Sequence, residues 1–479
     1  MTQNNKIIIF TIFLGFFISI LITSNNLNKY DKNVKRADGS YYHQMIKADA
    51  YRYAAHGNEI KNQLKDGLNF FETGREHYTK YLPPRIYAAY YQLFDINLFN
   101  KLDSEKINTG VHFLYLLFQS LLYYFSIILL YFTISKIINH KTTFFIILFL
   151  CIEPTILQYH SSFWSESIFF SLQIILISLI LKKKQSNFNF FIIGIFLTLL
   201  SFQKEYSIFY IIPIIIYFYL TLDNLKYKKF IFLLLGFFLV QSVLGYNNYK
   251  RSGVFYIMTA DSKINLHLDL VARVMIPKLK TTDKEFFATE GKATLNWIQN
   301  NNINYNKKLM DKIDQPGYLE YRESLFEKDK PKFDSFIRSR TIYYLKNYPS
   351  DFIKYTFNTS MHILVLNPFH IHTDNNFISG EVYHGSNTHK KLIPYRIVYT
   401  LTLYLICLYG LWSMIKMKEY NLLLYLFFSV IYFYGLVSWH GNTRYFMPVV
   451  IYIAFFFGYG VDKLIDLKKI LSLKKSKIH

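Results

Sequence analysis

The sequence alternates between long apolar runs and shorter polar stretches. An α-helix needs about 20 mostly apolar residues to cross the hydrocarbon core of a bilayer, and ten runs of roughly that length recur along the chain. They cover residues 7–22, 111–135, 142–157, 163–181, 188–202, 208–222, 230–244, 393–415, 421–437 and 446–464. The pattern predicts an all-α membrane protein with many spans.

An eleventh segment, residues 351–366, is apolar enough to cross a membrane but carries several polar side chains. These are Asp351, Lys354, Asn358 and His362. Counting it as a span would invert the orientation of every later segment. We therefore expect an interfacial or re-entrant helix, which tolerates polar residues.

Two long polar segments interrupt the apolar runs, at residues 24–110 and 247–392. They divide the chain into a membrane module (1–246), an extramembrane segment (247–392) and a second membrane module (393–479). In the first segment, residues 41–55 have the apolar spacing of an amphipathic helix. A second surface helix is expected over residues 86–94, after paired prolines that forbid a continuous helix. In the later segment, helices are expected over residues 282–300 and 332–346.

The charge distribution orients these elements. The chain has 54 Lys and Arg residues against 32 Asp and Glu, a net charge of +22. Much of this excess lies in short clusters between apolar runs, at residues 182–184, 226–229 and 416–418, and basic clusters of this kind mark cytoplasmic loops. Both termini are then cytoplasmic and both long polar segments lie outside. No nucleic-acid partner is expected, and the sequence has no P-loop.

The first apolar run and the two cysteines have simple interpretations. Residues 22–25 lack the small-residue pattern of a cleavage site, so the first run is expected to be a retained helix and not a signal peptide. Cys151 and Cys407 both lie inside apolar runs, where a thiol acts as a small core side chain.

Ionisable residues gather where the predicted spans reach the outer surface. Asp38 follows the first run, Glu166 opens the fourth, and Lys204 lies between the fifth and sixth. His440 and Arg444 precede the last run. Charges near the hydrocarbon are costly and are often functional. Each could also be a solvated loop residue, a snorkelling anchor or, for Asp38-Gly39, part of a turn.

An outer cleft lined by acids and bases suits the transfer of a group from a lipid phosphate. Lys and Arg side chains bind phosphate and stabilise the charge of a leaving phosphate. A carboxylate can take the proton from an acceptor hydroxyl. By residue type and position, Lys204, Arg444 and Arg85 are candidates for the donor phosphate, and His440 is either a phosphate ligand or structural.

Four short motifs carry a resemblance to a known family. They are Asp38-Gly39-Ser40-Tyr41-Tyr42, Tyr81-Leu82-Pro83-Pro84, Trp164-Ser165-Glu166 and Arg444-Tyr445-Phe446-Met447-Pro448. In these motifs and in its layout the chain resembles membrane glycosyltransferases of the GT-C fold. More narrowly, it is similar to the family that contains protein O-mannosyltransferases and the lipid A aminoarabinose transferase.

This resemblance implies a polyprenyl-phosphate-linked sugar as donor and Asp38 as the catalytic carboxylate. The family often has an acidic pair in the first loop, but Gly39 follows Asp38 here, so Asp49 and Glu166 are the candidates for a second acid. A divalent cation is left open, and the histidines between residues 370 and 389 match no standard metal-site spacing.

The sequence therefore predicts a multi-pass glycosyltransferase of the bacterial inner membrane, with its active site on the outer face and an inverting mechanism. The acceptor could be a lipid, a protein or a glycan. Two alternatives stay open: a polysaccharide polymerase or ligase, and a non-enzymatic lipid flippase or transporter. Against the transporter, the sequence has no charge pairs at the middle of the spans and no duplicated halves.

Overall fold

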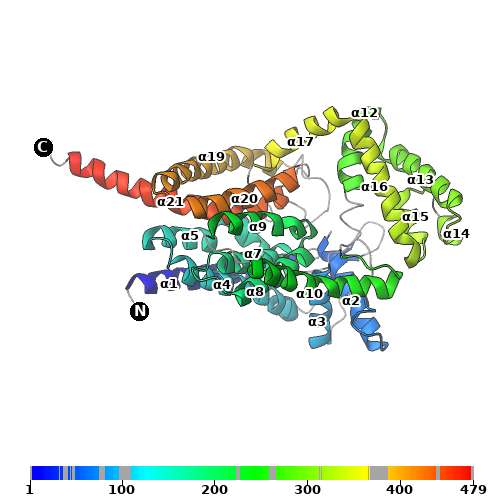
Figure 1. Ribbon diagram of the computed structural model, residues 1–479, viewed down its shortest axis with the longest axis horizontal. Coiled ribbons are helices and arrows are strands. Elements are labelled where there is room, and N and C mark those ends of the chain that lie inside the picture. Colours follow the sequence, from blue (N-terminus) through cyan, green and yellow to red (C-terminus); the bar gives the residue numbers. More distant parts are fainter. Residues whose placement is uncertain are drawn as a thin grey trace.

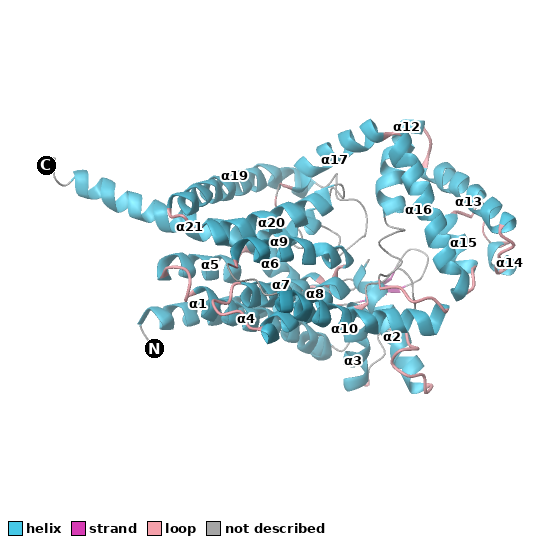
Figure 2. Ribbon diagram, viewed as in Figure 1, coloured by secondary structure: helices cyan, strands magenta, loops and turns pink. Residues whose placement is uncertain are grey.

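The computed structural model describes most of the chain. The described residues are 3–31, 33–35, 41–43, 45, 49–74, 81–95, 109–222, 227–257, 266–311, 313, 316–364, 366, 387–438 and 443–475. Helices make up nearly all of this structure (Figure 2).

All ten predicted spans are helical. They correspond to α1 (Gln3–Tyr30), α4 (Thr109–Ile134), α5 (His140–Ile152) with α6 (Pro154–His160), α7 (Glu166–Ile180), α8 (Asn187–Gln203), the 3-10 helix η1 (Glu205–Tyr210) with α9 (Ile211–Thr221), α10 (Tyr227–Ser252), α19 (Asn387–Lys416), α20 (Tyr420–Val437) and α21 (Thr443–Lys475). Five are long and apolar enough to cross a membrane alone, α5 and α6 form one bent candidate span, and the other four are shorter apolar helices. The prediction of an all-α multi-pass membrane protein is confirmed.

The remaining elements belong to the two long polar segments of the sequence. They are β1 (Asn33–Lys35), β2 (Tyr41–His43), α2 (Asp49–Lys65), α3 (Leu82–Leu93), the π-helix η2 (Leu266–Val271), α12 (Ala272–Leu279), α13 (Asp283–Asn300), α14 (Lys307–Met310), α15 (Tyr318–Ser324), the 3-10 helix η3 (Glu327–Asp329), α16 (Lys330–Asn347) and α17 (Pro349–Ile363). Helices α13 and α16 confirm the two helices expected in the later polar segment.

The bundle has two distinct ends. The start of α1 and the end of α21 lie at one end, and the helices from α12 to α16 lie beyond the other (Figure 1). We call this second end the domain end. Helices α2 and α3 also lie there, so both long polar segments of the sequence meet the same end of the bundle (Figure 1).

Two predictions for the first polar segment are wrong in detail. Residues 41–43 form a strand that pairs antiparallel with β1, and the helix begins only at Asp49. Helix α3 begins at Leu82 and includes both prolines, because a proline in the first turn of a helix replaces an N–H that has no partner inside the helix.

The third span is bent by 48° where α5 meets α6. Pro154 has no N–H to continue the helix, and the carboxylate of Glu153 accepts a hydrogen bond of 2.9 Å from the backbone N–H of Ile156. The same carboxylate accepts a hydrogen bond from the hydroxyl of Tyr399 on α19. The buried acid therefore caps α6 and links the third span to the eighth.

Glycines let several helices of the bundle cross closely. A Cβ on Gly410 of α19 would lie 1.8 Å from the carbonyl oxygen of Phe456 on α21, and one on Gly460 would lie 2.1 Å from the carbonyl oxygen of Ile406. Gly194 of α8 has an equivalent contact with α10, at 2.1 Å from the carbonyl oxygen of Leu233. In membranes, such close backbone approach contributes strongly to helix association.

Helices η2 to α16 enclose a buried ionic cluster. Glu290 accepts hydrogen bonds from Arg340 at 2.5 Å and from Tyr344 at 2.7 Å, and it lies 3.2 Å from His267. Burial raises the pKa of Glu290, but the bonds from His267, Arg340 and Tyr344 outweigh it and hold the pKa at about 2. The carboxylate is therefore charged at neutral pH and joins η2, α13 and α16.

The close crossing of α19 and α21 yields a testable prediction. We expect Gly410→Ala to lower the free energy of unfolding by about 1–3 kcal/mol, because the new methyl group overpacks a filled contact. Thermal unfolding of the protein in detergent measures this effect. Gly435→Ala on α20 is the matched control, since nothing lies within 4 Å of its Cβ position. Equal losses in the two variants would contradict the packing of α19 on α21.

Candidate functional site

The short turn between α6 and α7 is held by side chains from three other helices. Asn26 of α1 donates to the hydroxyl of Ser161 at 2.8 Å. The backbone carbonyl of Ser162 accepts from Gln119 of α4 at 3.2 Å, and that of Ser165 accepts from Gln203 of α8 at 2.7 Å. These buried bonds fix the point at the domain end where α7 begins.

Helix α7 begins with Glu166, which forms a buried ion pair with Lys204. The Lys204 Nζ atom lies 2.5 Å from Glu166 Oε1, and the two side chains are only 3% and 2% exposed. Glu166 occupies the first turn of α7, where the helix dipole favours a negative charge. Lys204 follows the last residue of α8, where an extended backbone separates α8 from η1. The two helix ends therefore bring opposite charges together inside the protein.

A second buried pair joins the end of α1 to the start of α4. Asp31 Oδ1 lies 2.7 Å from His112 Nδ1, and both side chains are buried. The His112 ring also packs edge-on against Phe163, with the centroids 5.2 Å apart. This pair fixes the chain just before strand β1. The residues that connect β1 to β2, which include Asp38, lie outside the described part.

Arg85 lies at the start of α3, close to the end of α8. Its guanidinium stacks on the Tyr81 ring at 3.7 Å and donates to the backbone carbonyls of Tyr81 and Thr73, each at 3.3 Å. Burial lowers the pKa of Arg85 to about 10, so the group stays charged at neutral pH. The Tyr81 ring in turn packs on Phe202, with the ring centroids 4.8 Å apart. Arg85 is thus linked through Tyr81 to the segment that carries Lys204.

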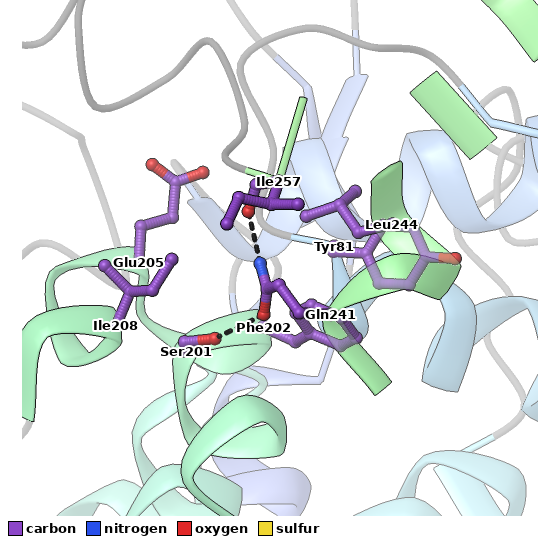
Figure 3. A pocket seen from close by; sticks show the side chains of 8 residues that line it. All are labelled: Tyr81, Ser201, Phe202, Glu205, Ile208, Gln241, Leu244 and Ile257. Carbon is purple, nitrogen blue, oxygen red and sulfur yellow. Dashed lines mark hydrogen bonds between the residues drawn. The ribbon is translucent and has the colours of Figure 1, made fainter. Parts of the chain in front are cut away.

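A small hollow with an interior volume of about 10 Å³, enough for about one water molecule, lies beside this contact (Figure 3). It is lined by Tyr81, Ser201, Phe202, Glu205, Ile208, Gln241, Leu244 and Ile257. The amide of Gln241 donates to the carbonyl of Ile257, and the carboxylate of Glu205 points away from the other labelled side chains (Figure 3). The hollow is too small for a sugar. One of its lining residues, Glu205, directly follows Lys204 in the sequence.

The structure brings together some of the predicted site residues. Glu166 and Lys204 are in contact, and Arg85 lies near them through Tyr81 and Phe202. Asp38 and His440 lie outside the described residues. Arg444 is part of α21, but its side chain is outside the described part.

Three further observations concern metal binding, Asp49 and a charge pair that the sequence did not reveal. Among the described residues, no group of three or more His, Cys, Asp or Glu side chains could hold a metal ion. Asp49 begins α2. Sequence reasoning missed the Asp31–His112 pair, although both residues lie at span ends, as Glu166 does. That position was the available signal.

The surroundings of the Glu166–Lys204 pair determine what it can do chemically. Inside the protein the dielectric constant is lower than in water, so the charges of Lys204 and Glu166 interact more strongly than the same charges would on the surface. The carboxylate also fixes the direction of the ammonium. The ammonium is the group of this pair that could bind an anion, and both groups are almost fully buried.

The comparisons with known proteins concern the fold. The chain matches no known family profile and no curated protein. Its structure is similar to that of the archaeal oligosaccharyltransferase AglB from Archaeoglobus fulgidus, a GT-C glycosyltransferase solved in complex with an inhibitory peptide and a dolichol-phosphate. The TM-score is 0.45 and the sequence identity 12%. The similarity covers 97% of this chain and 52% of that one, so this chain spans about half its length.

The buried ion pair yields a testable prediction. We expect Lys204→Met and Glu166→Gln each to lower the free energy of unfolding by about 3–5 kcal/mol, because each leaves one buried charge without its counter-ion contact. The double variant should recover most of that loss, since both charges are removed together. Unfolding in detergent measures all three variants. Lys141→Met is the control: its pair with Asp466 is exposed and contributes less than about 1 kcal/mol. Strictly additive losses in the double variant would contradict the pairing.

Proposed function

We propose that the protein is a glycosyltransferase that uses a polyprenyl-phosphate-linked sugar. It transfers the sugar to an acceptor hydroxyl at the domain end of the bundle, on the outer face of a bacterial inner membrane. Both termini lie on the cytoplasmic side in this proposal, as the basic loops favour. The acceptor is a lipid, a protein or a glycan.

The observation that carries the proposal is the buried Glu166–Lys204 pair. Glu166 begins the apolar helix α7 and Lys204 directly follows the apolar helix α8. Burying a pair of charges in a membrane protein costs free energy, and such pairs often have a function. Lys204 contacts the donor phosphate and stabilises the charge that develops when the polyprenyl phosphate leaves. Glu166 holds the ammonium group in a fixed direction.

Asp38 is the general base in this proposal. It takes the proton from the acceptor hydroxyl, the hydroxyl oxygen attacks the anomeric carbon, and the bond from that carbon to the phosphate oxygen breaks. A single displacement of this kind inverts the anomeric centre. The position of Asp38 in the sequence supports the assignment, because it lies between two paired strands that follow directly on the Asp31–His112 contact.

Further cations take part in binding the donor. Arg444 and His440 precede the apolar part of the last span and are proposed as additional phosphate ligands. Arg85 is proposed to act at the edge of the site, since its guanidinium is already bonded to two backbone carbonyls. A divalent cation is left to experiment, and the assay described next is run with and without a chelator.

Transfer from a radiolabelled polyprenyl-phosphate sugar by the purified protein tests the function. We expect Asp38→Asn to lower the transfer rate by about 10²–10⁴-fold with little change in donor binding, because the amide cannot accept the proton. Asp66→Asn is the control, since Asp66 is an exposed acid in the same polar segment. Near-normal transfer by Asp38→Asn would refute the role of Asp38. Movement of labelled lipid across the bilayer without sugar transfer would instead identify a flippase.

A further inference from the structure

Helix α17 carries an uncovered apolar stripe. Ile353, Phe357 and Met361 are spaced by four residues and so lie on one face of the helix. They are 70%, 65% and 55% exposed with respect to the described residues. Large apolar side chains in such a row are unusual on a surface that faces water.

The two ends of α17 belong to different apolar cores. Phe352 is buried with Val271, Met275 and Tyr344 in the core of the extramembrane helices. Ile363 is fully buried in the core of the membrane bundle. The helix therefore runs from the extramembrane helices into the bundle, as Figure 1 shows for its path between α12 and α19.

The carboxy-terminal end of α17 lies alongside the membrane spans, at a point inside the span of α19 and not at its end. Tyr434 of α20 donates to the carbonyl of Ser360 at 3.3 Å, and Tyr404 of α19 donates to the carbonyl of Leu364 at 2.6 Å. The N–H of Leu366 donates to Thr400 of α19 at 3.1 Å. The candidate span of α19 begins at Ile393, so Thr400 lies about 10 Å inside it at 1.5 Å per residue.

Helix α17 has polar side chains near its start and along one edge. Near its start, Asp351 pairs with Lys278 of α12 at 3.1 Å. Lys354 and Asn358 are exposed beside the apolar stripe and give the helix a polar edge. A helix with a polar start, a polar edge and an apolar face is suited to enter a bilayer at an angle.

We propose that the exposed face of α17 is inserted into the bilayer leaflet at the domain end, with Phe357 and Met361 among the lipid chains. The partner is the lipid itself, because the stripe continues toward a depth at which α19 also exposes Tyr395, Val398 and Leu401. The inserted helix attaches the extramembrane helices to the membrane surface beside the proposed site.

Site-directed spin labelling in a lipid bilayer tests this insertion. Single cysteines replace Phe357 and Met361 in a background with Cys151→Ala and Cys407→Ala, and collision rates are measured with oxygen, which enters lipid, and with a water-soluble nickel chelate. Lys346→Cys on α16 is the aqueous control and Val398→Cys on α19 is the lipid control, since both residues are exposed.

We expect the oxygen-to-nickel ratio at positions 357 and 361 to match that at 398 and to exceed that at 346 several-fold. A ratio equal to that at 346 would place the stripe in water and overturn the proposal. Low collision rates with both reagents would show that protein covers the stripe, either residues 367–386 or a second copy of the chain, and would overturn it equally.

Discussion

A buried pair of opposite charges between the start of α7 and the end of α8 constrains the rest of this structure. Glu166 and Lys204 are both nearly inaccessible to solvent, so each must be stabilised by the protein. Their meeting requires that α7 begin and α8 end at the same level of the bundle. The turn before α7 is accordingly fixed by Asn26, Gln119 and Gln203, which come from three different helices.

Breaks in the membrane helices serve this geometry. The extended backbone at Lys204 separates α8 from η1 and lets the side chain turn toward α7. Above the pair, the contact of Tyr81 with Phe202 connects α3 to the end of α8, and the contact of His112 with Asp31 fixes the chain that leads to strand β1. The first polar segment is thereby held over one end of the bundle, where the proposed donor phosphate would lie.

The sequence predicts the spans well and the site only in part. Ten apolar runs suffice to place ten apolar helical segments, of which five single helices and one bent pair are long enough to cross a bilayer. The pairing of strands β1 and β2 and the early start of α3 escape such reasoning, since they depend on local pairing and on the position of proline in the first turn. The level of Glu166 and Lys204 can be read from the apolar runs, but their contact cannot, because it depends on which helices are neighbours. The Asp31–His112 contact is missed for the same reason.

The central claim is that a lipid phosphate binds at the Glu166–Lys204 pair. Photolabelling with a polyprenyl phosphate that carries a diazirine next to the phosphate tests this claim most directly. The account predicts cross-links to residues 161–166 and 203–207, and their loss in the double variant Glu166→Gln/Lys204→Met. Cross-links confined to the opposite end of the bundle, or unchanged by the double variant, would contradict it.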